Sequence, residues 1–489
     1  MNLESIVFVV YLLFMLGIGI WFFIKDRQGG EKTYFLGGRQ MGPWVSALSA
    51  GASDMSAWVL MGLPASVFAL GLGQTWIAIG LAIGYTCSWI FEASRLRKFS
   101  IVADDSITIP QYLTNRFLSK SKALQILCAV IFLVAYTIYA ASSIKACGTL
   151  FSTVIKGLDA NVAMYIAAVV IVSYTFLGGF SAVCWTDFFQ GLLMLAALLV
   201  APIFALFIVK TTGTQASVEL NNPDYWNLFA DWKEIISGLG WGLGYFGMPH
   251  IIVRFMSLRS DKDLKKSAKI GVIWTVLILI FSVASAIVAH LLLGDVLEDS
   301  STVFIQMVRK IFPALLSGVL LSAILAASMS TADSQLLAAS SAFASDVYKP
   351  VVRKNKASDK EMLWVGRIVV LVISVVAVIV AADPNSGTIM SLVENAWGVF
   401  GAAFGPAIML SLFWKRFNFA GAITGIAVGA FVDISWLICP FLSGLGIYEI
   451  VPATIIGLIV SVVVTLCTKA PGDDVVALFD QAVAYQDAE

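Results

Sequence analysis

The stretch Ala47-Leu-Ser-Ala-Gly-Ala-Ser-Asp-Met-Ser-Ala-Trp-Val-Leu-Met-Gly-Leu-Pro64 decides how the rest of the chain is interpreted. It is apolar enough to lie in a bilayer, yet its centre holds Gly51, Ser53, Asp54 and Ser56, which weaken a helix and bind water or ions. A carboxylate at membrane depth costs at least about 2.5–3.5 kcal/mol on insertion scales, so such a residue usually has a function. We therefore predict a broken membrane helix whose gap holds a cation.

The composition places the whole chain in a membrane. Of its 489 residues 59% are hydrophobic and 13% are charged, and the mean hydropathy is +0.89. Soluble domains are about 25% charged, and apolar runs long enough to span a bilayer recur along this chain. The formal net charge is zero, so no nucleic acid or acidic partner is expected. We predict an all-α, multi-pass protein of the cell membrane.

The apolar runs predict thirteen transmembrane helices. The first run, 6–24, has Glu4 before it and Lys25 and Arg27 after it, which is the reverse of a signal peptide. It is therefore predicted to be a retained helix. The predicted spans are 5–25, 45–70, 73–95, 123–152, 160–178, 182–209, 233–256, 268–294, 312–342, 362–382, 387–413, 418–441 and 449–468.

The basic residues between the spans predict in which direction each span crosses the membrane. Loops that follow odd-numbered spans hold most of the lysines and arginines, and positive charge marks the cytoplasmic side. We therefore predict that the N-terminus is outside and the C-terminus is cytoplasmic. Loops that follow even-numbered spans are nearly free of basic residues, with these exceptions: Lys156, Lys210, Arg309 and Lys310.

Three segments lie between or beyond the spans. Residues 106–119 predict a short amphipathic helix at the inner surface, and the polar, aromatic segment 211–232 suits the outer interface. The residues after Lys469 are expected to form a surface tail.

The six cysteines occur singly, which argues against a disulfide framework or a zinc site. His250 and His290 are expected to be packing residues.

A second irregular helix is predicted at 235–250, where five glycines and Pro249 make a continuous helix unfavourable. Gly-interrupted segments at corresponding places in two halves are the best sequence indication of a transporter's central binding site. The second and seventh spans lie five apart, as an inverted repeat of five helices requires. The alternative is two unrelated flexible helices in a large bundle.

The ninth span, 312–342, is rich in small and hydroxyl residues. Ala327, Ser330 and Thr331 sit at positions i, i+3 and i+4 and share one helix face. Hydroxyls and free carbonyls can coordinate Na⁺ without fully neutralising it, so the ion can leave again. The alternative is that these hydroxyls bond back to the preceding helical turn.

Four motifs together resemble the sodium:solute symporter family, in the expected order and through essentially all thirteen spans. Within that family the chain is most similar to bacterial members that carry proline. The motifs are Ser49–Ser56, Gly178–Gln190, Gly240–Gly247 and Leu321–Gln335.

The resemblance implies a LeuT-type core of five plus five helices in inverted repeat, with one helix before it and two after it. The implied regions are an N-terminal helix and inner loop at 1–38, a transport core at 39–416, and two further helices with a short cytoplasmic tail at 417–489. Na⁺ would lie between the first broken helix and the ninth span.

The resemblance also implies the Na⁺ ligands. Asp54 would lie beside the ion and tune its affinity by charge, and a proton carrier is its alternative role. The implied ligands are the backbone oxygens of Ala52, Met55 and Ala327 and the side-chain oxygens of Ser330 and Thr331.

The implied substrate pocket surrounds the two helix breaks. Aromatic rings suit a pyrrolidine ring, while hydroxyls and free N–H groups suit a carboxylate. Each aromatic alone is equally well explained by packing. Met248 replaces a polar amide of the proline-carrying relatives, which leaves other solutes open. The pocket residues are Ser56, Trp58, Tyr139, Trp241, Tyr245 and Pro249.

The resemblance also implies a second cation site. Asp187 would form it together with Asp333 and Ser334, as in some members of the family. Asp187 as a gating or structural acid is the alternative. Arg39 is predicted to pair with such an acid at an inner gate, or to be an ordinary cytoplasmic charge.

These features predict a secondary transporter that couples Na⁺ influx to uptake of L-proline by alternating access, with Na⁺ as coupling ion and no organic cofactor. Another amino acid, a carboxylate vitamin or a sugar is the alternative substrate. A sodium-linked sensor is the rival class, and a cytoplasmic kinase extension would identify it. An enzyme is disfavoured because the nucleophile, metal and phosphate-binding motifs are missing.

Overall fold

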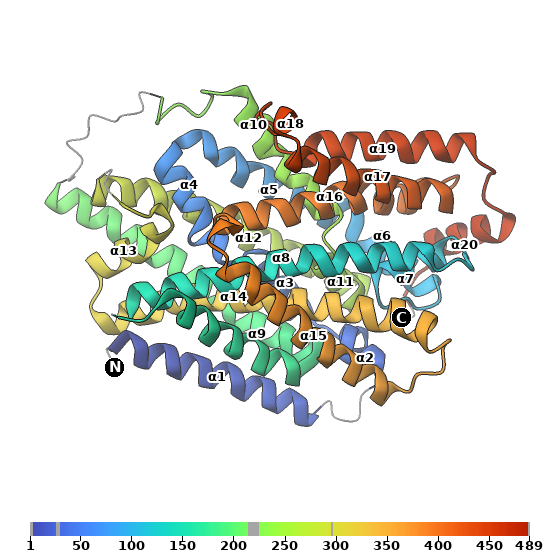
Figure 1. Ribbon diagram of the computed structural model, residues 1–489, viewed down its shortest axis with the longest axis horizontal. Coiled ribbons are helices and arrows are strands. Elements are labelled where there is room, and N and C mark those ends of the chain that lie inside the picture. Colours follow the sequence, from blue (N-terminus) through green and yellow to red (C-terminus); the bar gives the residue numbers. More distant parts are fainter. Residues whose placement is uncertain (1–2, 26–29, 156, 214–223, 295–296, 488–489) are drawn as a thin grey trace.

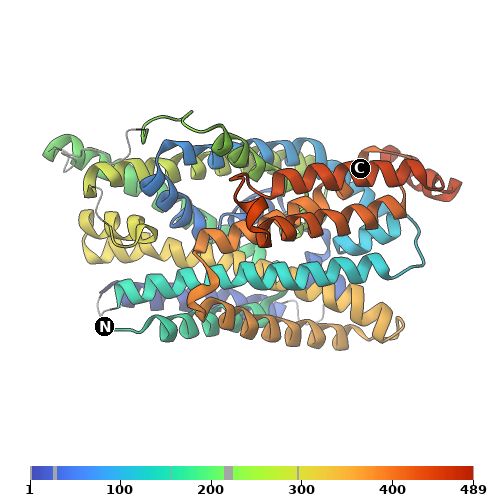
Figure 2. The same ribbon diagram turned by 45° about the horizontal axis from the view of Figure 1, so that its top comes forward.

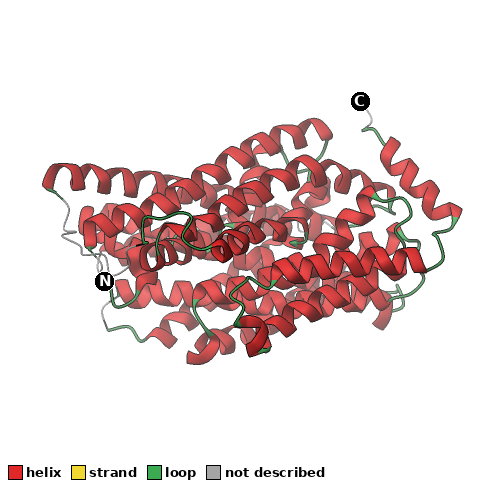
Figure 3. Cartoon of the chain, turned by 90° about the horizontal axis from the view of Figure 1, so that it is seen from above, coloured by secondary structure: helices red, strands yellow, loops and turns green. Residues whose placement is uncertain are grey.

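The helices run side by side along the long axis of the molecule (Figure 1). The computed structural model describes residues 3–25, 30–155, 157–213, 224–294 and 297–487. Within these ranges there are helices and loops and no strand (Figure 3), and one isolated β-bridge joins Met41 to Leu258. The two ends of the chain lie at opposite ends of the bundle in Figures 1 and 2.

The α-helices are α1 (Leu3–Lys25), α2 (Glu31–Leu36), α3 (Pro43–Asp54), α4 (Gly62–Leu70), α5 (Thr75–Cys87), α6 (Ala93–Val102), α7 (Ile109–Arg116), α8 (Ala123–Val154), α9 (Ala160–Thr212), α10 (Trp232–Gly240), α11 (Pro249–Ser257), α12 (Asp261–Leu293), α13 (Val303–Ile311), α14 (Ala314–Ser341), α15 (Asp359–Ala382), α16 (Ile389–Phe413), α17 (Phe419–Ile438), α18 (Pro440–Ser443), α19 (Ile450–Cys467) and α20 (Asp473–Ala484). Short 3₁₀ or π segments are η1 (Gly37–Arg39), η2 (Ala57–Val59), η3 (Leu72–Gln74), η4 (Ser88–Glu92), η5 (Trp241–Phe246), η6 (Ser300–Thr302), η7 (Ala342–Val352) and η8 (Pro384–Ser386).

Ten helices in the described part of the chain are long and apolar enough to cross a membrane, and a bent pair brings the number to eleven. The bent pair is α3 with η2 and α4, which meet at 72°. Two predicted spans fall on shorter pieces: 160–178 on the first part of α9, and 233–256 on α10, η5 and α11. The protein is a multi-pass membrane protein, and the count of thirteen stays a prediction.

A kink at Gly179 divides α9 into the two predicted spans. Gly179 has φ 62° inside a helix, a value that favours glycine. A Cβ atom there would also lie 2.7 Å from the ring of Tyr34. The chain therefore changes direction at Gly179, and Asp187 follows on the second part of α9.

The predicted irregular helix at 235–250 is three pieces: α10, the 3₁₀ segment η5, and α11, which begins at Pro249. Glycines let η5 press closely against α5. A Cβ atom on Gly242 would lie 2.4 Å from the carbonyl oxygen of Gly80, and one on Gly84 would lie 2.2 Å from the carbonyl oxygen of Gly242. The glycines thus serve close packing as well as the break.

The segments outside the long helices are more ordered than their sequences indicate. The predicted helix within 106–119 is α7, capped by Thr108, whose hydroxyl accepts from the N–H of Gln111 at 3.1 Å. The expected surface tail contains α20, where Phe479 packs on Phe99 with ring centroids 5.2 Å apart. The predicted outer segment 211–232 lies partly outside the described residues.

The helix α14 lies at the centre of the bundle. Nearly all of its side chains from Ser317 to Ser341 are buried, and it packs against α1, α3, α8 and α9. Small residues permit such close contact between helices in a membrane. The face that carries Ala327, Ser330 and Thr331 is thereby brought to the end of α3.

Candidate functional site

The break after α3 frees a backbone oxygen. Helical dihedrals end at Met55, with φ −79° and ψ 71°, and Ser56 is extended. The N–H of Ser56 turns to the carbonyl of Asp54 at 2.9 Å, so it does not complete the helical bond to Ala52. The Ala52 carbonyl, fully buried at the end of the helix, is left for another partner.

The hydroxyls of α14 meet that carbonyl. Ser330 Oγ lies 2.8 Å from the Ala52 carbonyl oxygen and 3.1 Å from the Ala327 carbonyl oxygen. Thr331 Oγ1 lies 3.5 Å from the same Ala52 oxygen. Four of the five predicted Na⁺ ligands therefore converge. Met55, the fifth, is buried at the break after α3.

Asp54 lies at the last residue of α3 and is fully buried. Its Oδ2 accepts a hydrogen bond from the hydroxyl of Tyr245 at 2.5 Å, and its Oδ1 has no hydrogen-bond partner among the described residues. Its backbone oxygen accepts from the indole N–H of Trp58 at 3.2 Å. The bond to Tyr245 joins the two irregular segments through a carboxylate.

Aromatic rings from both irregular segments pack together. The rings of Trp58 and Trp241 have centroids 6.3 Å apart, and Trp241 also packs on Tyr448 at 5.1 Å and Trp397 at 6.2 Å. The Ser56 hydroxyl accepts from the N–H of Trp58 at 3.3 Å. The predicted pocket residues Ser56, Trp58, Trp241 and Tyr245 thus form one buried cluster.

Tyr139 belongs to the same surroundings. It lies on α8 and is fully buried. Its ring also faces His250, with centroids 6.3 Å apart. A cavity of about 340 Å³ reaches Trp241 from the side that carries the start of α10 and the start of α19.

Pro249 and Met248 lie on the other side of the cluster. Pro249 lines a narrow cavity of about 30 Å³ together with Phe180, Arg254 and Ser334. That volume holds about one water molecule. Met248 is the buried residue before α11, where its backbone is extended.

A buried arginine, which sequence reasoning missed, connects four helices. Arg254 on α11 is 1% exposed, and its Nη2 lies 3.2 Å from Asp187 Oδ2 and 2.5 Å from Ser334 Oγ. The hydroxyl of Ser49 donates to the same Asp187 oxygen at 2.6 Å. Arg254 lies inside the predicted span 233–256, so the rule that singled out Asp54 also applies to it.

Asp333 lies next to this network. It is fully buried, and its Oδ1 accepts from the hydroxyl of Ser334 at 3.2 Å. Asp187, Ser334 and Asp333 are therefore close together, as predicted. The positive charge that faces Asp187 and Ser334 belongs to Arg254.

In this structure Arg39 pairs with neither Asp187 nor Asp333. Arg39 Nε donates to Asp105 at 2.8 Å, and its Nη2 donates to the carbonyl of Ser106 at 2.8 Å. The reason is the kinked entry to α3, where Arg39 itself has φ 56° and faces the loop after α6. Arg39 thus ties that loop to the chain before α3.

The chain is similar to known proteins over nearly its whole length. The model of the sodium:solute symporter family matches residues 34–429. The high-affinity proline transporter PutP of Bacillus subtilis strain 168 is 43% identical over 476 residues, which cover 96% of this chain and 98% of that protein. The osmoregulated proline transporter OpuE of the same strain is 43% identical over 487 residues, 98% of each chain. A sodium/proline symporter of Staphylococcus aureus strain JH9 is 42% identical over 479 residues, 96% of this chain and 93% of that protein.

Solved structures share the fold. A Na⁺-coupled sialic acid symporter in a substrate-bound, outward-open state superposes with a TM-score of 0.78 at 21% identity, over 96% of this chain and 99% of that one. The nucleobase-cation-symport-1 family transporter Mhp1 in a closed conformation gives a TM-score of 0.56 at 13% identity, over 92% of this chain and 98% of that one. At these identities the similarity establishes the architecture of the bundle.

Proposed function

Because the chain belongs to the sodium:solute symporter family, we propose that it couples Na⁺ influx to the uptake of L-proline. Relatives named as proline transporters match it over nearly their whole lengths at 42–43% identity. The observation that carries the proposal is the meeting of Ser330 with the free carbonyl of Ala52, beside a buried aromatic cluster on the same broken helix.

The proposed Na⁺ site consists of the Ala52, Met55 and Ala327 carbonyls with the Ser330 and Thr331 hydroxyls. Hard oxygen ligands suit a small alkali cation, and the carbonyl of Ala52 has no helical N–H to compete for it. Asp54 adds a buried negative charge nearby, which favours a cation in a region of low dielectric constant. These features support an ion site whose affinity Asp54 tunes.

The proposed substrate site is the cluster of Ser56, Trp58, Tyr139, Trp241 and Tyr245, with Pro249 on its inner side. An apolar pyrrolidine ring packs well on indole and phenol rings. The hydroxyl of Ser56 and the N–H of Ala57, the first residue of η2, suit a carboxylate. The cavity that ends at Trp241 supports access from the outer side.

Coupling would reside in the segment from Ala52 to Trp58, which contributes to both sites. Na⁺ bound to Ala52 and Ser330 would hold α14 against the break and order Ser56 and Trp58 for substrate. Such a coupling is reciprocal, so substrate raises the affinity for Na⁺ by the same factor. The membrane potential adds about 2.3 kcal/mol per charge for each 100 mV, and this drives accumulation.

The proposal includes the membrane topology and the repeat. We assign thirteen spans in the cell membrane, an outer N-terminus and a cytoplasmic C-terminus, and a five-plus-five inverted-repeat core at 39–416 between flanking regions 1–38 and 417–489. The opposite positions of the two ends in Figure 1 are consistent with an odd number of spans. The bend of 72° after α3 and the 3₁₀ segment after α10 support breaks in both halves.

The network around Arg254 bears on the proposed second cation site at Asp187, Asp333 and Ser334. Arg254 supplies a positive charge to Asp187 and Ser334 in the present arrangement. A second Na⁺ would need Arg254 to move away. The alternative role of Asp187, as a structural or gating acid paired with Arg254, is favoured by this contact.

Uptake into proteoliposomes tests the transport function. Purified full-length protein is expected to accumulate labelled L-proline only with an inward Na⁺ gradient, and more strongly when the interior is negative. Unlabelled L-proline competes, and a K⁺ gradient of equal size is the control.

Two outcomes would contradict the proposal. Na⁺-driven uptake of another amino acid, a carboxylate vitamin or a sugar, without competition by proline, would refute the substrate. Specific Na⁺-dependent binding of proline without any accumulation would favour the sensor.

A further inference from the structure

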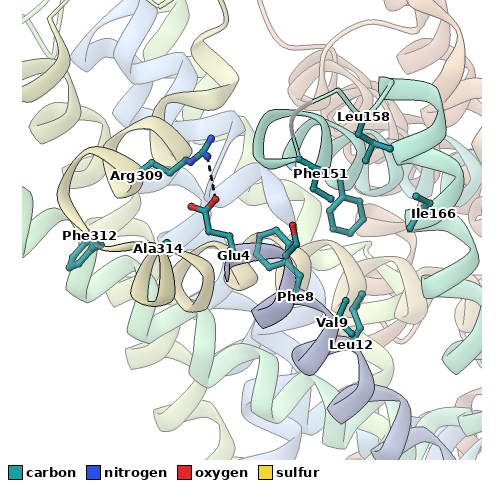
Figure 4. Close-up of a pocket in the computed structure, with 12 residues that line it drawn as sticks. Glu4, Phe8, Val9, Leu12, Phe151, Leu158, Ile166, Arg309, Phe312 and Ala314 are labelled. Atoms are coloured by element: carbon teal, nitrogen blue, oxygen red, sulfur yellow. Dashed lines mark ion pairs between the residues drawn. The ribbon is translucent and has the colours of Figure 1, made fainter. Parts of the chain in front are cut away.

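A second large cavity lies apart from the transport site. It has a volume of about 840 Å³ and opens between α1, the end of α8, the start of α9, and the junction of α13 with α14 (Figure 4). None of the proposed Na⁺ or substrate ligands lines it. Its volume lies in the range of about 300–1,000 Å³ that is usual for binding sites of small ligands.

The cavity has an apolar part and a charged end. Phe8, Leu12, Phe151 and Ile166 line the apolar part, and Phe8 faces Phe151 with ring centroids 6.1 Å apart. At the other end Arg309 points toward Glu4, as Figure 4 shows, with Nη2 3.2 Å from Glu4 Oε2. Along α1, Glu4 lies at the charged end of the cavity, and Phe8 and Leu12 line its apolar part.

The charge that is accessible at this end is positive. The side chain of Glu4 is 6% exposed and also accepts from the Ser317 hydroxyl at 2.8 Å, whereas that of Arg309 is 31% exposed. Lys310, the next residue, is exposed as well. A guanidinium matches the geometry of a phosphate better than any other side chain.

The cavity also lies at the right depth for a lipid. Glu4 and Leu12 are separated by about 12 Å along α1, since a helix rises about 1.5 Å per residue. Half of the hydrocarbon core is about 15 Å thick, so the cavity extends from the headgroup region toward the acyl chains. Val9 and Ile166 line it and are each 44% exposed, which places its open side toward the lipid.

We propose that this cavity binds one anionic glycerophospholipid of the outer leaflet, with its phosphodiester on Arg309 and an acyl chain along Phe8, Leu12 and Ile166. Basic pockets between transmembrane helices bind lipid headgroups in this way. The proposal also gives a reason for Arg309 and Lys310, two of the four basic residues that depart from the charge rule in the predicted outer loops. It concerns a site that is separate from transport.

Native mass spectrometry of the purified full-length protein tests the headgroup contact, with phosphatidylglycerol and phosphatidylcholine added at equal concentrations. We expect one phosphatidylglycerol to be retained in preference to phosphatidylcholine. Arg309→Gln is expected to weaken its binding at least tenfold. Lys210→Gln removes another exposed outer charge, at the end of α9, and is expected to leave binding unchanged.

A second variant leaves the Glu4–Arg309 pair intact, in case Arg309→Gln disturbs folding. Ile166→Trp fills the apolar part and is expected to weaken phosphatidylglycerol binding at least fivefold. Val169→Trp, on the same helix and 69% exposed outside the cavity, is the matched control.

Three results would overturn the proposal. If the two lipids were retained equally, or if each variant bound phosphatidylglycerol as well as its control, the bound lipid would be annular lipid without a specific site. Free inorganic phosphate that competes fully with the lipid would mean an anion site without an acyl chain. A dimer whose interface excludes lipid from this cavity would assign the surface to a second copy of the chain.

Discussion

Two carboxylates of the bundle, Asp54 and Asp187, are equally buried and have different partners. Asp187 faces the guanidinium of Arg254 and accepts from the hydroxyl of Ser49. Asp54 accepts from the neutral hydroxyl of Tyr245, and no cationic side chain in the described ranges pairs with it. Both are fully buried, so neither charge is balanced by solvent.

The difference lies in the partner: Asp187 has a cationic side chain against it, and Asp54 has a neutral phenol. The charge of Asp187 is balanced by a residue of the chain itself. Asp54 has no such partner among the described side chains, and the proposed Na⁺ site at Ala52 and Ser330 would place a cation near it. An uncompensated charge at this depth is costly, so we expect any cation bound near Asp54 to be sensitive to its charge.

The largest expected effect comes from removing the partner of Asp187. Arg254→Gln would leave a buried carboxylate uncompensated, and breaking a buried pair costs about 3–5 kcal/mol. Thermal unfolding in detergent measures the loss of stability. The double variant Asp187→Asn/Arg254→Gln is expected to regain most of it.

The matched control for this prediction is Arg259→Gln, which removes an exposed arginine paired with Asp263 one turn along the chain. No measurable change in unfolding temperature is expected there. If Arg254→Gln unfolded no more easily than Arg259→Gln, the structural role of the Arg254–Asp187 pair would be refuted.

The next effect concerns Asp54. Asp54→Asn removes the buried charge beside the proposed ion site, so the Na⁺ concentration for half-maximal uptake is expected to rise at least tenfold, or about 1.4 kcal/mol. A Na⁺ titration of initial uptake rates measures it. The control is Asp480→Asn, which changes an exposed acid of α20. An equal effect of the two variants would refute the electrostatic role of Asp54.

Smaller effects are expected at the two hydroxyls of α14. Ser330 Oγ lies 2.8 Å from the Ala52 oxygen and Thr331 Oγ1 lies 3.5 Å from it, so Ser330→Ala is expected to raise the half-maximal Na⁺ concentration more than Thr331→Ala. Losing one uncharged hydrogen-bonding ligand corresponds to about 0.5–1.5 kcal/mol, or roughly two- to tenfold. Ser328→Ala, a buried hydroxyl of the same helix, is the control. An unchanged Na⁺ dependence in both variants would remove the proposed site.

The smallest effect tests the second cation site. If Arg254 supplies the positive charge at Asp187 and Ser334, then Asp333→Asn is expected to leave the Hill slope for Na⁺ and the charge moved per substrate unchanged. Paired fluxes of labelled Na⁺ and proline measure the ratio. A lower ratio in Asp333→Asn would instead establish a second transported cation near Asp333.

Local features of the sequence were sufficient to predict the helical class and the two irregular segments. Hydropathy identifies apolar helices residue by residue, and glycine, proline and serine weaken a helix where they stand. The end of α3 at Asp54 and the 3₁₀ segment from Trp241 follow from such local rules. The Ser330 and Thr331 face also follows from helical spacing alone.

The partners of the buried charges were decided by the tertiary structure. Arg254 and Asp187 are 67 residues apart and Arg39 and Asp105 are 66 apart, so no local pattern links them. The first pair depends on how α9 and α11 pack, and the second on how the loop after α6 meets the chain before α3.

The sequence by itself determined a membrane-embedded helical protein with a break at Asp54 and a hydroxyl face on a second helix, because hydropathy and helix propensity act over a few residues. Only the tertiary structure decided that Ser330 meets the carbonyl of Ala52, that Arg254 balances Asp187, and that Arg309 stands at a cavity beside α1. The physical reason is that charges and hydrogen bonds act over a few ångströms in space, and packing of distant helices alone brings these groups within that range.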